Sequence, residues 1–120
     1  MNFNLDKVPS TLDEAVQLLK EATDNKEQAV IKTLDRYQLH FSLGQFIRNE
    51  WSLWNTGNVL NVWFRKKYGV DHADDISSII LDCLINDLNN KPRRDLELAK
   101  DFIEHWQSHK KKITNKKNKD

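Results

Sequence analysis

The sequence predicts an all-α fold: a compact bundle of five or six short helices, followed by a disordered basic C-terminal tail. Three observations lead to this prediction. Apolar residues recur at the three- and four-residue spacing of a helix face through most of the chain. Capping residues and helix-ending turns separate these stretches. Runs of valine and isoleucine lie only inside helical patterns, so the sequence shows no convincing strand and no internal repeat.

Three helices are expected in the first half of the chain. The first follows a cap at Ser10 or Thr11, with an acidic residue three positions later. The second begins at residue 24 or 25, and its narrow apolar stripe reaches Tyr37. The third runs from about Ser42 to Trp54 on a broad apolar stripe, and a turn around Gly57 follows it.

Three further helices are expected in the second half. The fourth begins at Val59 and ends at Gly69, a residue type that commonly ends helices. The fifth, which opens within residues 71–75, is the clearest, because its apolar positions from Ile76 to Leu88 fit a helix and could hardly stay in register as a strand. The sixth is expected from about Arg94 to Ser108, after a break at 89–92.

Length and charge divide the chain into a body and a tail. Residues 1–108 are predicted to form a single helical domain, within the usual size of about 100–150 residues. Residues 109–120 hold six lysines and one aspartate, whereas the rest of the chain holds 13 basic and 17 acidic residues. This lysine-rich tail is predicted to be disordered, because it has one apolar residue, Ile113.

Cysteine usage and hydropathy predict a cytoplasmic protein. The single Cys83 excludes an internal disulfide and any multi-cysteine zinc site, and it fits a reducing compartment. Its place on an apolar helix face favours a core residue over a nucleophile. The N-terminus resembles no signal peptide, and no stretch approaches the roughly 20 apolar residues of a membrane span. No metal site and no cofactor are expected.

Arg48, Asn49 and Glu50 form the first candidate polar site, between the apolar residues Ile47 and Trp51. Because neighbours on a helix lie about 100° apart, these polar residues cannot all face solvent while their flanks face the core. Asn49 is expected to face outward. Arg48 and Glu50 could line a cleft and bind an anion or a partner. Alternatively, Arg48 pairs with a distant carboxylate and joins two helices, since buried guanidinium groups nearly always have partners.

His72, Asp74, Asp75 and Ser77 form the second candidate polar site. The histidine and the aspartates could ligate a metal, although the short spacing is not specific. The alternative is helix initiation, because carboxylates in a first turn interact favourably with the helix dipole. One of the two aspartates is also a plausible partner for Arg48, which would join both candidate sites into one network.

Two tryptophans, Trp51 and Trp54, are candidate aromatic contacts for a partner. Trp51 belongs to a helical apolar stripe, which favours a core position, as it does for Trp63. Trp54 lies at the predicted end of its helix and is the best candidate for a partly exposed aromatic residue. The pair His105 and His109 has metal-ligand spacing but no evident third ligand, so a surface position is favoured.

Three segments together resemble a small bacterial family of unknown function over roughly residues 8–90. They are the Val-Pro-Ser-Thr-Leu segment that begins at Val8, an Ile-Arg-Asn-x-Trp-x-Leu segment that begins at Ile47, and a His-x-Asp-Asp-x-Ser segment that begins at His72. Ala73 stands where proline is expected to be common. The resemblance implies no activity, substrate or cofactor. It implies that the polar residues of these segments belong to the family pattern: Arg48, Asn49, Trp51, His72, Asp74, Asp75 and Ser77.

Three functional hypotheses remain open. The leading one is a non-enzymatic module that binds another protein, of the bacterial accessory or immunity type. The second is a ligand-binding domain or enzyme in which Arg48 holds an anion and His72, with Asp74 and Asp75, supplies the acid or base. The third is nucleic-acid binding through the lysine tail, which the acidic body disfavours.

Overall fold

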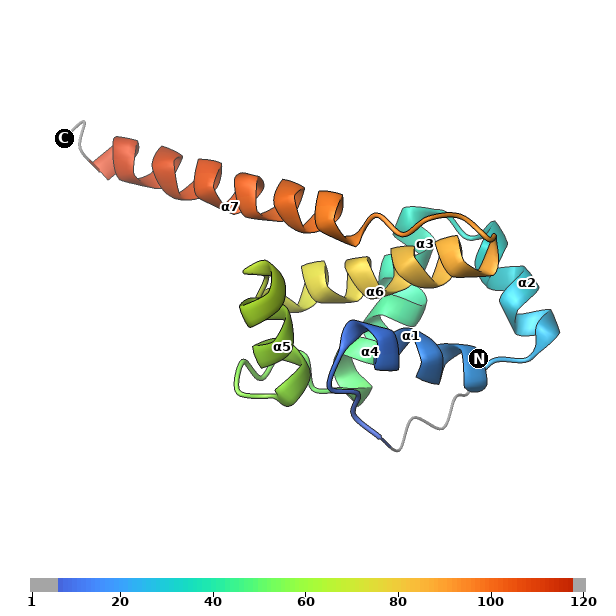
Figure 1. The fold of residues 1–120 in the computed structure, drawn as a ribbon. Helices are drawn as coiled ribbons and strands as arrows, with labels where there is room; N and C mark the ends of the chain where they lie inside the picture. The colour runs from blue at the N-terminus through green and yellow to red at the C-terminus, as the bar shows by residue number, and fades with distance from the viewer. Residues whose placement is uncertain (1–6, 118–120) are drawn as a thin grey trace.

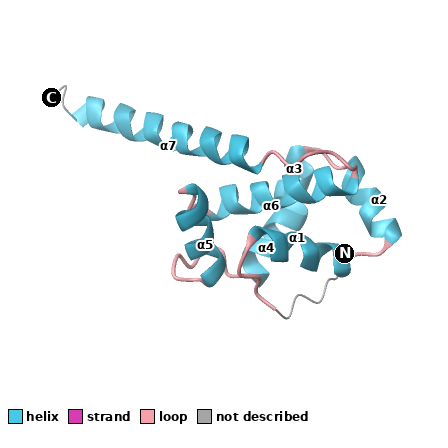
Figure 2. Cartoon of the chain, in the orientation of Figure 1, coloured by secondary structure: helices cyan, strands magenta, loops and turns pink. Residues whose placement is uncertain are grey.

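The all-α prediction is confirmed by a computed structural model, which describes the backbone of residues 7–117 and the side chains of residues 7–110. Every regular element in that part of the chain is helical (Figures 1 and 2). Three of the elements, α3, η1 and α4, follow one another without a break and form one helical run. The elements are α1 (Leu12–Glu21), α2 (Asn25–Thr33), α3 (Arg36–Leu39), the π-helical turn η1 (His40–Gly44), α4 (Gln45–Glu50), α5 (Val59–Tyr68), α6 (Ala73–Leu88) and α7 (Asp95–Lys117).

Side-chain caps set the start of the first helices. The Thr11 hydroxyl accepts a hydrogen bond from the backbone N–H of Glu14, and the Glu14 carboxylate accepts from Ser10. The predicted start of α1 is therefore confirmed. Asp24 and Glu27 form a reciprocal capping box at the start of α2. Such caps satisfy backbone N–H groups that have no partner inside the helix.

The prediction was wrong about the boundary between the second and third helices. The predicted stripe reached Tyr37, but α2 ends at Thr33 and Leu34 has an extended backbone. A new capping box at Asp35 starts the α3–η1–α4 run ahead of the predicted Ser42. The run also ends at Glu50 rather than Trp54, since Ser52 adopts a left-handed φ of 50° that a helix cannot contain.

Helix α6 lies at the centre of the molecule and packs against α1, α2, η1, α4, α5 and α7 (Figure 1). Its start and end confirm the predicted fifth helix. The buried side chains of α6 meet those of the surrounding helices, and each such side chain contributes roughly 1.5–3 kcal/mol on leaving water. The largest fully buried residues are Trp51, Phe64, Leu19, Ile31, Ile47, Leu53, Leu60, Ile76, Ile79, Ile80, Leu84 and Val16.

Helix α5 follows its prediction closely. It begins at Val59, where the Asn58 side chain accepts from the backbone N–H of Leu60. It ends before Gly69, whose φ of 77° is the left-handed conformation that favours glycine at a helix end. This turn directs the chain into α6 after a short connection.

Helix α7 extends beyond the position that the sequence predicts. Its first turns pack on the body, with Leu98 and Ala99 buried, and its C-terminal half runs away from the body (Figure 1). The predicted end at Ser108 is too early, because the helix continues to Lys117. Lysine has good helix propensity, and no glycine or proline interrupts this stretch. The rest of the predicted disordered tail, residues 118–120, lies outside the described residues.

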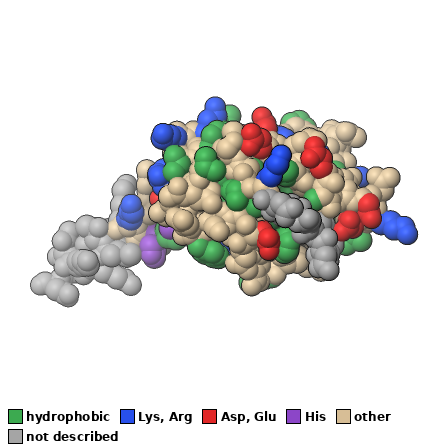
Figure 3. All heavy atoms as spheres, turned by 90° about the horizontal axis from the view of Figure 1, so that it is seen from below, with side chains coloured by type: hydrophobic (Ala, Val, Ile, Leu, Met, Phe, Trp, Pro, Cys, Tyr) green, Lys and Arg blue, Asp and Glu red, His purple; other side chains and the backbone are tan. Residues whose placement is uncertain are grey.

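Acidic, basic and apolar side chains are dispersed over the face of the body drawn in Figure 3. Histidine side chains lie where the projecting helix leaves the body. In the described part of the chain, no helix combines the length and the apolar character needed to cross a membrane.

Candidate functional site

The side chain of Arg48 runs from α4 into the interior, and only 4% of the residue is exposed. Its Nη1 donates a 2.9 Å hydrogen bond to the Ser77 hydroxyl on α6, and its Nη2 donates a 3.0 Å bond to the His40 carbonyl. Its Nε lies 3.4 Å from Oδ1 of Asp74. We call these four residues the arginine lock, because one guanidinium joins the α3–η1–α4 run to α6.

The π-helical turn supplies the carbonyl at the centre of the lock. The N–H of Gln45 donates to the His40 carbonyl five residues earlier, and Arg48 donates to the same oxygen. A carbonyl oxygen has two lone pairs and can accept both bonds. Gly44 leaves room for the guanidinium, since a Cβ there would lie 2.9 Å from the Arg48 Nη1. The turn and its glycine therefore shape the space that Arg48 fills.

The predicted pairing of Arg48 with one of the two aspartates is confirmed, and the partner is Asp74. Burial lowers the pKa of Arg48, and the negative charge of Asp74 opposes this shift. The guanidinium nevertheless stays protonated at physiological pH. The Asp74 side chain is 56% exposed, so solvent screens the ion pair. The hydrogen bonds to Ser77 and His40 therefore contribute most of the lock's energy.

The Ser77 hydroxyl has no proton left to donate to a ligand. Its hydroxyl donates a 2.9 Å bond to the carbonyl of Asp74 while it accepts from Arg48. Ser77 itself is 1% exposed. The geometry therefore matches the alternative in which Arg48 joins two helices, and it leaves the guanidinium closed to an anion from solvent.

His72 and Asp75 belong to a second cluster, formed with Trp106 on α7. The indole Nε1 of Trp106 donates a 2.8 Å hydrogen bond to Oδ2 of Asp75. The His72 ring stacks on the indole, with ring centroids 3.8 Å apart and planes 11° from parallel. Burial raises the pKa of Asp75, while the bond from Trp106 and the charge of His72 act in the opposite direction. This cluster holds α7 against the start of α6.

The two candidate polar sites are therefore joined only in part. The lock takes Arg48, Asp74 and Ser77, whereas His72 and Asp75 face Trp106. Both aspartates lie in the first turn of α6, as the helix-initiation alternative requires. Among the described side chains, no three histidine, cysteine or acidic residues are placed to hold a metal.

Asn49 and Glu50 are exposed at the end of α4, outside the lock. Asn49 faces outward as predicted, and its Oδ1 accepts a 3.3 Å hydrogen bond from the indole of Trp54. Glu50 does not share a cleft with the buried Arg48. The predicted cleft between these two charged residues is therefore absent from the described structure.

The two candidate aromatic contacts have opposite environments. Trp51 is fully buried, so the hypothesis that it contacts a partner was wrong, and the core position that its apolar stripe favoured is confirmed. Trp54 is 61% exposed, which confirms the predicted exposure. The guanidinium carbon of Arg48 lies 5.9 Å from the centroid of the Trp54 ring. The guanidinium of the lock therefore packs against the face of an exposed tryptophan.

Two more exposed aromatic residues lie on the α3–η1 segment, one helical turn apart. Tyr37 is 76% exposed and Phe41 is 67% exposed. The Phe41 ring packs edge-on against His40, whose carbonyl Arg48 binds. A chain of contacts thus links Phe41 to Trp54 through the lock. We call Tyr37, Phe41 and Trp54 the aromatic face.

Sequence reasoning missed four of the residues that build these clusters. His40 acts through its backbone carbonyl, which no side-chain pattern reveals, and neither apolar spacing nor capping residues indicate the π turn. Gly44 was not singled out as a structural residue, although a glycine one turn before an interior arginine is a usable signal. Trp106 lies within the predicted sixth helix, but its N–H requires a hydrogen-bond partner that the spacing of apolar residues does not identify. Phe41 was not considered.

Other candidate residues have structural environments. Cys83 is buried, and burial raises the pKa of its thiol to about 12, so it carries little thiolate at neutral pH. His105 and His109 both pack edge-on against Trp106. Of the six tail lysines, only Lys110 has a described side chain.

Comparison with known protein families gives one match. Residues 8–88 match the model of a family described as a domain of unknown function (DUF6794). The matched range runs from the first capping segment to the end of α6 and leaves α7 outside. Searches of curated proteins and of solved structures returned no match.

Proposed function

The chain belongs to the DUF6794 family, and we propose that it is a non-enzymatic module that binds another protein through its aromatic face. The observation that carries this proposal is the exposure of Tyr37, Phe41 and Trp54 above a rigid lock. Tyr37 and Phe41 lie one turn apart on one helical segment. Exposed apolar patches mark surfaces that partners cover. Tyrosine and tryptophan are also the residues that most often dominate binding energy at interfaces.

The rigidity of the face supports this proposal. Trp54 is held by its hydrogen bond to Asn49 and lies over the guanidinium of Arg48. Phe41 packs on His40, which belongs to the π turn of the lock. Side chains that are ordered before binding lose less conformational entropy when the complex forms. In this proposal the Arg48-Asn49-x-Trp51 segment therefore positions the contact surface and takes no part in any chemical step.

The test is partner capture with single substitutions on the aromatic face. The chain is immobilised and exposed to extract of its native host, and proteins retained in stoichiometric amount are quantified. Phe41→Ala and Trp54→Ala should each weaken retention about tenfold or more, as for residues at the centre of an interface. Leu96→Ala is the matched control, because Leu96 is 69% exposed but lies on α7.

The outcomes separate binding from folding. Circular dichroism melting curves should show that all three variants fold like the native chain, since the replaced side chains are exposed. Retention that is lost in both aromatic-face variants and kept in Leu96→Ala supports the proposal. Equal retention by all variants, or no stoichiometric partner for the native chain, contradicts it.

The cellular setting belongs to the same proposal. We infer a bacterial cytoplasmic protein of the accessory or immunity type, on the basis of the motifs quoted above and the unpaired, buried Cys83. Fractionation of the native host, with the chain detected by antibody, checks the compartment. Recovery in a secreted or membrane fraction would contradict this part of the proposal.

A further inference from the structure

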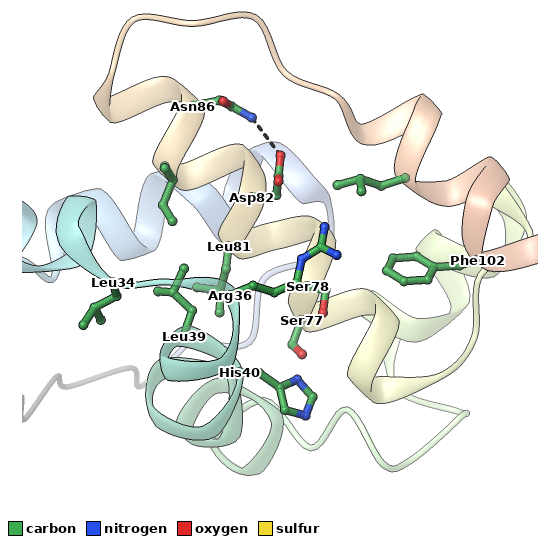
Figure 4. A pocket seen from close by; sticks show the side chains of 12 residues that line it. Leu34, Arg36, Leu39, His40, Ser77, Ser78, Leu81, Asp82, Asn86 and Phe102 are labelled. Carbon is green, nitrogen blue, oxygen red and sulfur yellow. Dashed lines mark hydrogen bonds between the residues drawn. The ribbon is translucent and has the colours of Figure 1, made fainter. Parts of the chain in front are cut away.

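A pocket of about 240 Å³ lies between the α3–η1 segment, α6 and α7 (Figure 4). It is separate from the aromatic face, and Arg48 does not line it, although His40 and Ser77 border both the pocket and the lock. Its walls are mainly apolar and come from these three elements and from Leu34, which lies between α2 and α3; the other apolar residues are Leu39, Leu81, Ile85, Leu98 and Phe102. A concave apolar site with a few polar groups is the usual form of a small-molecule site.

The pocket lining contains one arginine without an ion pair to a described residue, Arg36, and one aspartate that is already paired, Asp82. Arg36 is exposed and extends from α3 toward α6 in Figure 4, and it has no ion pair with any described residue. Asp82, the acidic residue of the lining, accepts hydrogen bonds from Asn86 at 2.7 Å and from Arg94 at 3.0 Å. Arg94 therefore neutralises Asp82. The guanidinium of Arg36 can pair with an anionic group of a ligand.

We propose that this pocket binds a small amphiphilic carboxylate, with the carboxylate paired to Arg36 and the apolar part against the leucine and phenylalanine side chains. Arginine presents a planar fork of donors that matches a carboxylate in two parallel hydrogen bonds. Drug-sized ligands occupy roughly 300–1,000 Å³, so a volume of about 240 Å³ selects a smaller molecule.

Helix α7 completes the site. Leu98 and Phe102 form its third wall, and the Phe102 ring points into the pocket in Figure 4. Both residues lie beyond the range 8–88 that matches the family. The carboxylate would thus bridge the matched domain and the helix that follows it. This inference does not depend on the protein-binding role of the aromatic face, since neither Phe41 nor Trp54 lines the pocket.

The test is isothermal titration of the full chain with octanoate, compared with 1-octanol and octylamine, which have the same number of carbon atoms but lack the negative charge. Octanoate should bind saturably at millimolar concentration or below, and more tightly than either comparison compound. Arg36→Gln should weaken octanoate binding about tenfold or more, as expected for loss of a charged pair. Lys66→Gln is the matched control: it removes one exposed positive charge on α5, outside the pocket lining.

A second measurement locates the binding. Octanoate should shift the backbone NMR signals of the pocket segments, residues 34–40, 77–86 and 98–102, and leave those around Trp54 unchanged. The inference is overturned if octanoate does not saturate, if octanol or octylamine binds as tightly, or if Arg36→Gln binds as the native chain does. A melting curve of Arg36→Gln like that of the native chain ensures that the comparison concerns folded protein.

Discussion

Arg48 shows how one residue can join two elements. Its guanidinium has three nitrogens in one plane, and each nitrogen faces a different oxygen: those of Ser77, His40 and Asp74. A lysine carries the same charge on a single nitrogen and could not reach all three oxygens. The requirement for arginine therefore comes from geometry more than from charge.

The first prediction concerns Gly44, which makes room for this guanidinium. A Cβ at residue 44 would lie 2.9 Å from the Arg48 Nη1 and 3.0 Å from the carbonyl oxygen of Leu39. Gly44→Ala should therefore destabilise the fold by about 1–3 kcal/mol, as overpacking does, although alanine is the better helix former by about 1 kcal/mol. Urea denaturation monitored by tryptophan fluorescence measures the difference.

Gly57→Ala is the matched control for this prediction. A Cβ at Gly57 meets its nearest atom, the Asn55 side-chain oxygen, at 3.4 Å, which is ordinary contact. Its free energy of unfolding should stay within about 0.5 kcal/mol of the native value, as for most surface changes. Equal effects of the two alanines would show that close packing around Arg48 is not the reason for Gly44.

At the scale of elements, α6 has an aspartate near each end, and the fold shifts the pKa values of these two carboxylates in opposite directions. Near its start, burial raises the pKa of Asp75. Near its end, hydrogen bonds from Arg93 lower the pKa of Asp87, with a further bond from Lys20. The first carboxylate therefore weakens the fold when it ionises, and the second strengthens it.

The second prediction follows from these opposite shifts. Asp75 has a folded pKa above its unfolded value of about 3.9, so its stabilising contribution is full below that pH and is lost as pH rises through the folded pKa. Relative to the native chain, Asp75→Asn should thus gain stability as pH rises from about 3.9, while its amide oxygen still accepts from Trp106.

Asp87→Asn should behave in the opposite way. Its folded pKa lies below about 3.9, so the contribution of the carboxylate is present above that pH and is lost as pH falls through the folded value. At neutral pH the variant should be less stable by about 1–3 kcal/mol, the usual worth of hydrogen bonds to a charged group. Urea midpoints measured across the acid range check both variants, and parallel profiles would contradict the assignment of the two shifts.

At the scale of the whole molecule, the sequence predicts what local chemistry determines. Caps at Thr11 and Asp24 and the left-handed Gly69 depend on nearby residues, and their positions were predicted correctly or within one residue. The break between α2 and α3 was missed because the apolar spacing continues through it to Tyr37. The capping box at Asp35 starts a new helix in spite of that spacing. The end of α7 was predicted too early because the lysine-rich stretch lacks the apolar residues of a core. Lysine nevertheless has good helix propensity, and the helix continues to Lys117.

The candidate site was predicted in part for the same reason. A buried arginine requires an acidic partner, so a bond from Arg48 to the Asp74-Asp75 turn could be expected. Adjacent aspartates on a helix point about 100° apart, and only the fold decides that Asp75 faces Trp106 instead. The π turn that presents the His40 carbonyl is likewise a property of the packed structure.

The central claim, that Arg48 holds the fold together and does not bind a ligand from solvent, is tested most directly by the stability of Arg48→Ala. The account predicts a loss of about 2–4 kcal/mol in the free energy of unfolding, from a truncated interior side chain and its lost hydrogen bonds. Asp74→Asn should change it by no more than about 1 kcal/mol, because Asp74 is exposed. A urea midpoint for Arg48→Ala equal to that of the native chain would contradict the account.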